Sequence, residues 1–518
     1  MSQSGTVVPS MSAHSRLRGV EEQLDFSGRF PFGIDQWAYV PFDVPPGTRR
    51  ITVTTTHGRF SLFGVALNVL DLGMFGPAGH DCVEGFRGWS GGARDEFTLS
   101  AADATPGYLP GPIDSGRWEL ALGPVVLNPL GMSWEVHVTL ERGVPLPEPT
   151  PSPVRAVVHD HGNGWYRGDL HLHTVHSDGT YHPEELAAVA RTAGLDFIVS
   201  TEHNTNSANE IWSAVRTEGL LVVAGEEVTT RHGHWLAVGL SPHGWVDWRY
   251  APRDDAFAAH AAGVRDRGGM VIAAHPAAPL PGSAWEFGYE SVDALEVWNG
   301  LWTPDDEVAL RIWHHLLIQG RRVAAVGGSD SHGPRQRVGR PHTVVHASDL
   351  STPALVESLR GGRSYLAESA AVTMTLTAVC SVDPTATVGP GETLPVPLGA
   401  TVTVCAAVSG APDAVLALIT PAGCVARAAV DASGAASLRW TTGDGGFARV
   451  EVRRRSRAGT STMVALTNPV WFSPAAVSRT PACHPTSAAG RQPEPRRAWV
   501  PRRRDRKVSG QRSASPPR

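Results

Sequence analysis

The chain has 518 residues and a formal net charge of −5. This length is too great for one ordinary hydrophobic core, so we expect about three domains. The charge balance leaves no global basic face of the kind that nucleic-acid binders present, and we therefore expect no specific nucleic-acid partner.

Membrane and disulfide signals are weak in the sequence. No run of about 18 apolar residues occurs, and the polar residues 1–22 lack the apolar segment of a secretory signal, so we expect a cytoplasmic protein without a membrane partner. The cysteines are odd in number and form no CxxC pair, which argues against a disulfide framework and against a cysteine-zinc site. They are Cys82, Cys380, Cys405, Cys424 and Cys483.

The N-terminal part is predicted to be β-rich. We expect residues 1–22 to be disordered. Residues 23–144 hold short runs of β-branched and aromatic residues between Gly/Pro-rich turns, which is typical of a β-sandwich. Residues 145–158 include the proline-rich run PLPEPTPSP and are predicted to form a stiff, extended linker.

Residues 159–371 change to apolar runs that alternate with helical periods, the pattern of βαβ units. Helices are predicted at 183–193, 254–267, 305–319 and 352–360. Strands are predicted at 168–173, 196–201, 220–225, 235–240, 270–274, 294–298 and 323–328. Seven strands with helical crossovers predict a barrel related to the (β/α)₈ design, in which functional side chains lie at the carboxyl ends of the strands.

The C-terminal part again has the composition of strands, and residues 372–473 are predicted to form a small β domain. Residues 474–518 are rich in proline, serine and arginine, with three consecutive arginines at 502–504. This composition predicts a basic, disordered tail.

Histidines gather in the central part, where 17 of the 22 lie between His159 and His346. Many of them follow the ends of predicted strands, where a packed core has no use for polar side chains. The first predicted strand ends in DLHLH, at 169–173. Because side chains on a strand alternate, His171 and His173 should point the same way and could hold one metal ion.

HSDG (176–179) comes soon after this strand, and comparable polar groups stand beside other predicted strands. TEHN (201–204), GEE (225–227), HP (275–276) and GSDSH (328–332) stand at the ends of the second, third, fifth and seventh strands, and GH (233–234) precedes the fourth. One HxH pair alone is more often structural, but five such groups in register favour a metal cluster. Their donors exceed what one four-coordinate zinc needs, so we expect two or three clustered ions.

These motifs resemble those of the PHP (polymerase and histidinol phosphatase) domain family, HxHxxxSDG, T(D/E)HN, GxE, HP and SDxH, over essentially the whole stretch 165–370. The segments GEE, GHWLAVG (233–239) and ALTNP (465–469) are similar to its CehA/McbA-like metallohydrolase subgroup. The resemblance implies a distorted (β/α)₇ barrel with a trinuclear metal site. The expected fold is therefore a multidomain chain, with this α/β barrel between an N-terminal β-sandwich and a small C-terminal β domain.

The resemblance also assigns ligands by motif. The first ion would be held by His171, His173, Glu227 and Asp330, the second by Glu227, His234 and His275, and the third by Asp178, His203 and His332. Glu227 would bridge two ions because it fits the GxE spacing better than Glu226, which stays open as the alternative. Glu227, Asp330 and His332 are the expected catalytic residues.

Four further residues have weaker predicted roles. Asp169 and Asn204 could orient ligand histidines, although capping or turn roles fit them about as well. Arg337 and Arg340 follow the last motif and could meet an anionic substrate, with a solvated surface as the alternative.

The expected cofactors are two to three divalent ions, Zn, Mn or Fe. Clustered ions lower the pKa of a bridging water, so a bridging hydroxide could attack without a protein nucleophile. The function that the resemblance favours is phosphoesterase activity on a small-molecule phosphoester. A carboxyl-ester or carbamate hydrolase is the alternative enzyme, and a nuclease is disfavoured by the net charge. A polymer-binding protein with a spent barrel is the alternative from another class, although a spent barrel tends to lose ligands and here the full set is present.

Overall fold

In the computed structural model of the chain, the described residues are 12–18, 20–34, 37–59, 61–62, 65–66, 68–144, 147, 161–215, 217–280, 282–455 and 461–474. They belong to one compact unit, residues 1–475. The predicted linker at 145–158, apart from residue 147, and the predicted tail at 474–518, apart from Pro474, lie outside the described residues.

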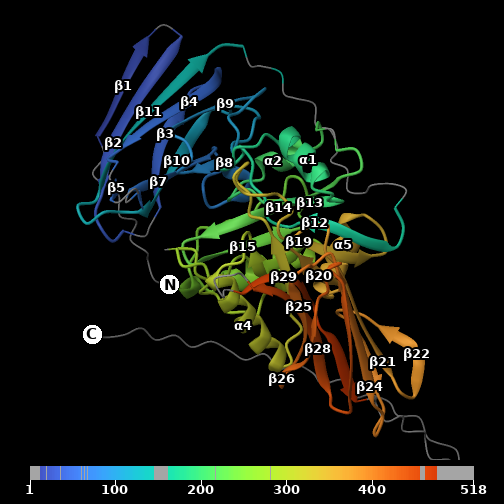
Figure 1. The fold of residues 1–518 in the computed structure, drawn as a ribbon. Helices are drawn as coiled ribbons and strands as arrows, with labels where there is room; N and C mark the ends of the chain where they lie inside the picture. Colours follow the sequence, from blue (N-terminus) through green and yellow to red (C-terminus); the bar gives the residue numbers. More distant parts are fainter. Residues whose placement is uncertain are drawn as a thin grey trace, which may run out of the picture. The chain divides into compact units, whose positions relative to one another are not determined.

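Two antiparallel sheets form the N-terminal part, coloured blue in Figure 1. One has the strand order β1-β2-β11-β4-β9 and the other β3-β10-β7-β8. Every second residue of β11 is buried, as expected for a strand with one face on a core. Phe30 and Trp134 of the first sheet share that core with Phe42 and Leu120 of the second. The strands are β1 (Ser12–Arg18), β2 (Glu21–Phe30), β3 (Ala38–Val44), β4 (Thr48–His57), β5 (Ser61–Leu62), β6 (Val65–Ala66), β7 (Val69–Phe75), β8 (Phe86–Gly91), β9 (Glu96–Ser100), β10 (Gly116–Val126) and β11 (Met132–Arg142), with a 3-10 turn η1 (Val83–Gly85).

Strand β1 corrects the expectation that residues 1–22 are disordered. It pairs antiparallel with β2, from Ser12 opposite Ser27 to Arg18 opposite Glu21. β1 is the edge strand of its sheet, and an edge strand can be polar because its partner supplies backbone hydrogen bonds. The polar composition of residues 12–18 therefore did not indicate the strand that they form.

A strand is present at each of the seven predicted positions of the central part, but the first one lies earlier than predicted and ends at Asp169, so His171 and His173 follow it and do not belong to it. The seven strands are β12 (Gly164–Asp169), β13 (Phe197–Ser200), β14 (Leu221–Thr230), β15 (Gly233–Val238), β16 (Met270–Ala273), β17 (Ala294–Asn299) and β18 (Ala324–Gly328). They lie in this order in one sheet. An isolated parallel bridge joins Leu172, just beyond β12, to Ser331, just beyond β18. The segments that follow the first and last of the seven strands are therefore neighbours.

The strand directions correct the expectation of seven parallel strands joined by helices. β12, β13 and β14 are parallel, as are β16, β17 and β18, but β15 is antiparallel to both β14 and β16. The cause is the connection, because only Arg231 and His232 separate β14 from β15, which permits a hairpin and no helical crossover. Two strands that were not predicted, β19 (His342–Ala347) and β20 (Ser364–Ala367), extend the sheet antiparallel beyond β12.

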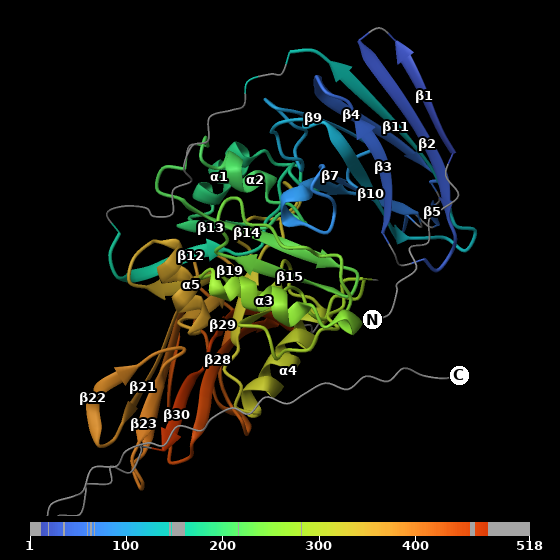
Figure 2. The same cartoon turned by 180° about the vertical axis from the view of Figure 1, so that it is seen from behind.

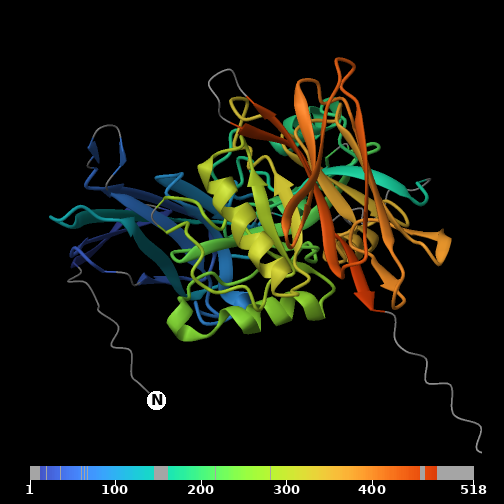
Figure 3. The same ribbon diagram turned by 60° about the horizontal axis from the view of Figure 1, so that its bottom comes forward.

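The four predicted helices are present as α1 (Pro183–Thr192), α3 (Phe257–Asp266), α4 (Pro304–Ile318) and α5 (Thr352–Arg360), and the structure adds a short α2 (Ser207–Ile211) and a 3-10 turn η2 (Pro252–Asp254). α1 begins at Pro183, and the Glu185 side chain caps its first turn by accepting a hydrogen bond from the His182 backbone N. The helix buries Leu186 and Ala190. α4 packs against β17 (Figure 3). Among the described residues, no helix is both long and apolar enough to cross a bilayer.

The C-terminal part continues the central sheet, because β29 pairs antiparallel with β20 (Figure 1; Figure 2 shows the same region from behind). A separate four-stranded sheet has the order β22-β21-β24-β27. Tyr365 of β20 and Val404 of β24 belong to the same core, so the predicted boundary at 371/372 does not separate two cores. The strands are β21 (Thr373–Cys380), β22 (Asp383–Val388), β23 (Thr393–Val396), β24 (Val402–Ser409), β25 (Ala414–Thr420), β26 (Gly423–Ala429), β27 (Ala436–Thr442), β28 (Gly446–Arg455), β29 (Ser461–Thr467) and β30 (Val470–Pro474).

Asn468 fixes this junction. Its Oδ1 accepts a hydrogen bond from the Ala325 backbone N at 2.7 Å, and its Nδ2 donates to the Ala325 backbone O and to Ser364 Oγ, each at 2.9 Å. The buried asparagine of the ALTNP motif thus ties β18 to the chain that precedes β30.

Candidate metal centre

The structure brings all nine predicted metal ligands together. They fall into four overlapping groups, and within each group the possible ligand atoms lie within 4.8 Å of one another. The groups are His173, Asp178, His203 and His332; His171, His275 and Asp330; His171, His173 and Glu227; and Glu227, His234 and His275. Because the groups share members, the nine side chains form one continuous cluster, which we call the histidine cluster.

Glu227, on β14, lies at the centre of the histidine cluster and is almost wholly inaccessible to solvent. Each of its carboxylate oxygens faces a different set of imidazoles, as a ligand between two ions would require. The Oε2 atom lies 3.2 Å from His171 Nε2, 3.3 Å from His173 Nε2 and 2.9 Å from His203 Nδ1, and the Oε1 atom lies 2.9 Å from His234 Nδ1 and 3.2 Å from His275 Nε2.

Glu226 points to the other face of β14, as alternation along a strand requires. It is also buried, but its Oε2 accepts a hydrogen bond from the Val246 backbone N at 2.9 Å. Burial raises the pKa of Glu226 well above its usual range, which favours the neutral form of this carboxyl group. Of the two glutamates, Glu227 is therefore the one that the histidine cluster contacts.

Two aspartates also contact histidines of the cluster. Asp330 Oδ1 lies 3.1 Å from His173 Nε2 and 3.4 Å from His171 Nε2. Asp178 Oδ1 lies 3.2 Å from His332 Nε2 and 3.6 Å from His203 Nε2. His173 thus belongs to the first and to the third expected group, whereas the motif comparison placed it only in the first.

The backbone is strained at three positions in or beside the cluster. Asn204, His275 and Asp330 have φ values of 53°, 25° and 49°, in the left-handed region that non-glycine residues rarely adopt. Such strain persists where the surrounding structure over-determines the conformation, and it concentrates at functional sites. The fold thus holds these residues in place at a cost in local stability.

Asn204 does not contact an imidazole directly. Its Oδ1 accepts a hydrogen bond from the Thr229 backbone N at 2.7 Å, and Thr229 Oγ1 lies 2.6 Å from His203 Nδ1. Asp169 likewise binds backbone, accepting from Ser329 N at 2.9 Å and Gly339 N at 2.8 Å. Both residues therefore fix the loops that carry ligands and leave the imidazoles to other partners.

Sequence reasoning missed two residues that support the ligands, Glu296 and Asn299 of β17. Glu296 lies with its carboxylate oxygens 3.1 and 3.2 Å from His171 Nδ1, and its Oε2 accepts from His275 N at 2.9 Å. Asn299 Nδ2 donates to Glu296 Oε2 at 3.0 Å and to Asp330 Oδ2 at 3.3 Å. The available signal was a charged residue inside the apolar sixth strand, ALEVW, where a core strand has no use for one.

In the metal-free cluster, burial and the carboxylates act in opposite directions on the pKa values of the histidines. Burial opposes charge on His203, but the carboxylates of Glu227 and Asp178 outweigh it and raise its pKa to about 10. Asp330, Glu296 and Glu227 likewise raise the pKa of His171 well above its usual value, against the effect of burial. Burial and the neighbouring histidines lower the pKa of His173 to about 3.

The donor set fits divalent metal ions. Several atoms that face the centre of the cluster are buried and have no hydrogen-bond partner, namely His171 Nε2, His173 Nε2, Glu227 Oε2 and Asp330 Oδ1. Buried polar atoms are normally satisfied, so a group of unsatisfied imidazole nitrogens and carboxylate oxygens points to a cation that they share. Imidazole with carboxylate is a ligand set that suits zinc, manganese and iron.

The N-terminal sheets contact the loops that carry ligands. Arg94 donates to the backbone O of Val175, three residues before Asp178. Gly107 N donates to Ser207 Oγ at 3.1 Å, and Gly107 O accepts from Thr205 Oγ1 at 2.8 Å, two residues after His203. The N-terminal part therefore borders the loops that carry the predicted ligands.

Arg337 and Arg340 are exposed, and their contact with substrate stays a prediction.

Comparisons with known proteins give distant similarities. No family model matches the chain. The uncharacterized protein MJ1587 from Methanocaldococcus jannaschii is 25% identical over 154 residues, which cover 26% of this chain and 81% of that protein. A two-domain protein from Bacteroides vulgatus is described as containing a predicted PHP-like metal-dependent phosphoesterase. It is 20% identical to this chain with a TM-score of 0.34, and the match covers 61% of this chain and 99% of that protein. An amidohydrolase from Chromobacterium violaceum, with bound sulfate and no metal, is 18% identical with a TM-score of 0.25. That match covers 33% of this chain and 89% of the amidohydrolase.

Proposed function

We propose that the protein is a metal-dependent hydrolase that cleaves phosphoester bonds in small molecules. The observation that carries this proposal is the histidine cluster itself, in which six imidazoles and two aspartates surround the buried Glu227. Glu227 and Asp330 would hold ions together with His171 and His173, and Asp178 would hold one with His203 and His332. Bound divalent ions would supply Lewis acidity and would make a water molecule acidic enough to act near pH 7.

The charge of the site supports an anionic substrate. Asp178, Glu227, Asp330 and the neighbouring Glu296 contribute up to four negative charges, whereas three divalent ions would contribute six positive ones. A surplus of positive charge in a partly enclosed site attracts a phosphoester dianion more strongly than a neutral ester.

The residues around the cluster define what the chain itself contributes. Glu296 and Asn299 orient His171 and Asp330, and Thr229 orients His203, so these contacts fix where the ligand atoms lie.

A GxSxG pattern occurs at residues 88–92, but Ser90 is buried and lies 2.9 Å from the Tyr108 hydroxyl. Ser90 is therefore not an exposed nucleophile of the kind that serine hydrolases use.

The test is elemental analysis of the purified protein together with hydrolysis of p-nitrophenyl phosphate, bis(p-nitrophenyl) phosphate and p-nitrophenyl acetate, with and without added Mn²⁺ or Zn²⁺. We expect two to three equivalents of divalent metal and the highest turnover on a phosphoester. Asp330→Asn is the control for contaminating phosphatases and should lose both metal and activity. Absence of metal and of any activation would contradict the proposal, and preferential cleavage of the carboxyl ester would identify the alternative hydrolase.

A further inference from the structure

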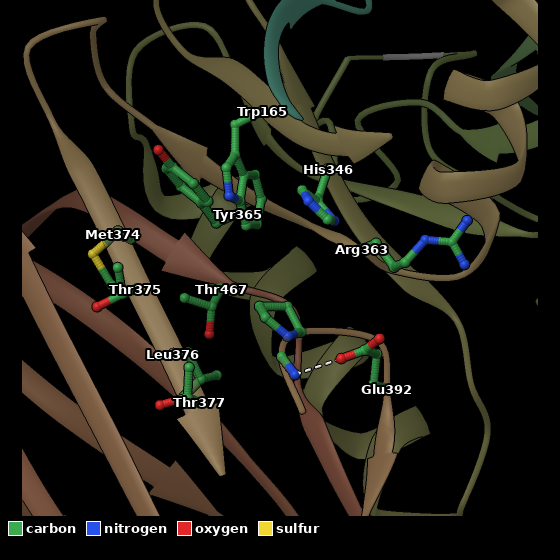
Figure 4. Close-up of a pocket in the computed structure, with 12 residues that line it drawn as sticks. Trp165, His346, Arg363, Tyr365, Met374, Thr375, Leu376, Thr377, Glu392 and Thr467 are labelled. Carbon is green, nitrogen blue, oxygen red and sulfur yellow. Dashed lines mark hydrogen bonds between the residues drawn. The ribbon is translucent and has the colours of Figure 1, made fainter. Parts of the chain in front are cut away.

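A pocket of about 310 Å³ lies at the junction of the central and C-terminal parts (Figure 4), where the central sheet meets the four-stranded sheet. Its walls come from β12, β19 and β20 on one side and from β21 and the turn that follows β22 on the other. Its volume is at the small end of the range for ligand pockets, about 300–1,000 Å³. None of its residues belongs to the histidine cluster. We call it the Trp165 pocket.

One wall of the pocket is aromatic. Trp165 is paired across the strands with His346, and the two ring centroids lie 5.0 Å apart. Tyr365 lies on the other side of Trp165 at 5.4 Å. Trp165 is 45% exposed, whereas Tyr365 is buried and its hydroxyl is bonded to the backbone of Met374. The pocket therefore presents one large, solvent-accessible indole on a rigid support.

The opposite wall is apolar on β21, with one hydroxyl group and one carboxylate beside it. Met374 and Leu376 are buried on β21, and Thr375 and Thr377 alternate with them on the other face of the strand. Thr467 Oγ1 accepts a hydrogen bond from Val450 N at 2.9 Å, so its own hydrogen can be donated to a ligand. Glu392 is oriented by a hydrogen bond from Gly389 N to its Oε2 at 2.6 Å, and its other oxygen can accept from a ligand.

The charges of the lining exclude an anionic occupant. Arg363 is the single arginine of the lining, and Figure 4 shows its guanidinium turned away from Trp165 and the threonines. Its Nη2 donates to Glu357 Oε1 and to Ser358 Oγ, each at 3.1 Å. An anion in the pocket would thus meet the Glu392 carboxylate without a free cation to balance it.

A quaternary ammonium ion fits less well than a neutral ligand. Ammonium cages surround the cation with several ring faces, whereas the three rings here pack on one another and leave mainly the Trp165 face accessible. An accessible indole face with a carboxylate near it suits a molecule with an apolar face and hydroxyl groups along its edge. Sugar rings have this form, since their axial C–H groups lie on one face and their hydroxyls at the rim.

We propose that the Trp165 pocket binds a neutral saccharide ring, with its C–H face on Trp165 and its hydroxyls at Glu392. This site is separate from the histidine cluster. It would give the protein a means to recognise a sugar or a glycosylated molecule whatever the reaction of the metal site.

The test uses the full chain in saturation-transfer NMR and tryptophan-fluorescence titrations with methyl β-glucoside, methyl β-galactoside, methyl α-mannoside and N-acetylglucosamine. At least one probe should bind, and Trp165→Ala should weaken that binding about tenfold or more through loss of the stacking face. Trp165→Phe should weaken it less, and Glu392→Ala should weaken it several-fold. Phe32→Ala removes another exposed aromatic side chain, outside the pocket, and should leave binding unchanged.

The metal content and turnover of the Trp165 and Glu392 variants should match the parent, which separates this test from that of the metal site. The proposal is overturned if none of the four probes binds, if binding survives in Trp165→Ala and Glu392→Ala, or if tetramethylammonium binds at Trp165 while the saccharides do not.

Discussion

At the scale of single residues, neighbouring glutamates on β14 have opposite chemistry. Glu227 contacts five histidines, whereas Glu226 accepts one backbone hydrogen bond, and burial raises its pKa well above the usual range. We expect Glu227→Gln to lose metal and to lower turnover at least about a hundredfold, because it removes the charge between the ions while keeping the size of the side chain. Metal analysis and steady-state kinetics measure both effects.

Glu226→Gln is the matched control. An amide replaces a carboxyl group whose neutral form is favoured by burial, and it can still accept from Val246 N, so turnover should stay within about threefold of the parent. Equal activity of Glu227→Gln and the parent would contradict the bridging role. Collapse of Glu226→Gln alone would show that the functional carboxylate is the other one.

Metal uptake should displace protons from the cluster. The pKa of His203 is raised to about 10, so this histidine is protonated at pH 7 in the metal-free form, and the pKa of His171 is raised well above its usual value, whereas a metal ligand must offer an unprotonated nitrogen. Ion binding should therefore release about two protons, and apparent affinity should rise with pH from 6 to 8. Calorimetry with Mn²⁺ in buffers of different ionisation enthalpy measures the number released. Heats that do not depend on the buffer would rule out this exchange.

At the scale of elements, the sequence predicted each strand that leads into the site because apolar runs and polar ends are local signals. β12, β13 and β18 are followed by the motifs that contain His171, His203 and Asp330, and Glu227 lies on β14 itself. The antiparallel direction of β15 was not predicted, because Arg231-His232 lacks the Asn-Gly or Asp-Gly signature of a tight hairpin. The pairing of β20 with β29 depends on residues almost a hundred positions apart, which no local pattern encodes.

The contact of α4 with β28 predicts a pH dependence of stability. Arg449 Nε donates to His314 Nδ1 at 3.4 Å, and burial together with the Arg449 charge lowers the pKa of His314 to about 4. The unfolded chain, with a pKa near 6.5, binds this proton first. The contribution is therefore fully present above about pH 6.5 and is lost as the pH falls toward 4.

For the half-buried His314, we expect a loss of roughly 1 kcal/mol between pH 7.5 and pH 5, after allowance for solvent screening. Denaturant titrations at the two pH values measure it. His314→Asn keeps an acceptor for Arg449 and should reduce this difference, whereas His315→Asn, on the exposed side of α4, should not. The same pH difference in all three proteins would show that His314 does not contribute.

At the scale of the whole molecule, one aromatic core connects the N-terminal sheets to the metal centre. Phe86 of β8 stacks on Trp245 of the central part, with centroids 4.1 Å apart and planes at 17°. Trp245 Nε1 in turn donates to the backbone O of Asn204 at 3.2 Å, next to His203. Packing between the parts of the chain therefore reaches a ligand loop through two contacts, which local sequence patterns could not predict.

Phe86→Ala should accordingly affect stability and the site together. Removal of a buried phenylalanine costs about 3–5 kcal/mol, and the loss of its ring frees Trp245 to move and loosens the backbone at Asn204. Phe30→Ala is the matched control, because Phe30 is equally buried but packs within the N-terminal core against Trp134. Both variants should unfold at lower denaturant concentration by similar amounts. Under conditions where both remain folded, Phe86→Ala alone should bind the divalent ions several-fold more weakly, as measured by metal titration. Equal metal affinity in the two variants would show that the aromatic core stabilises the chain without positioning the loop that carries His203.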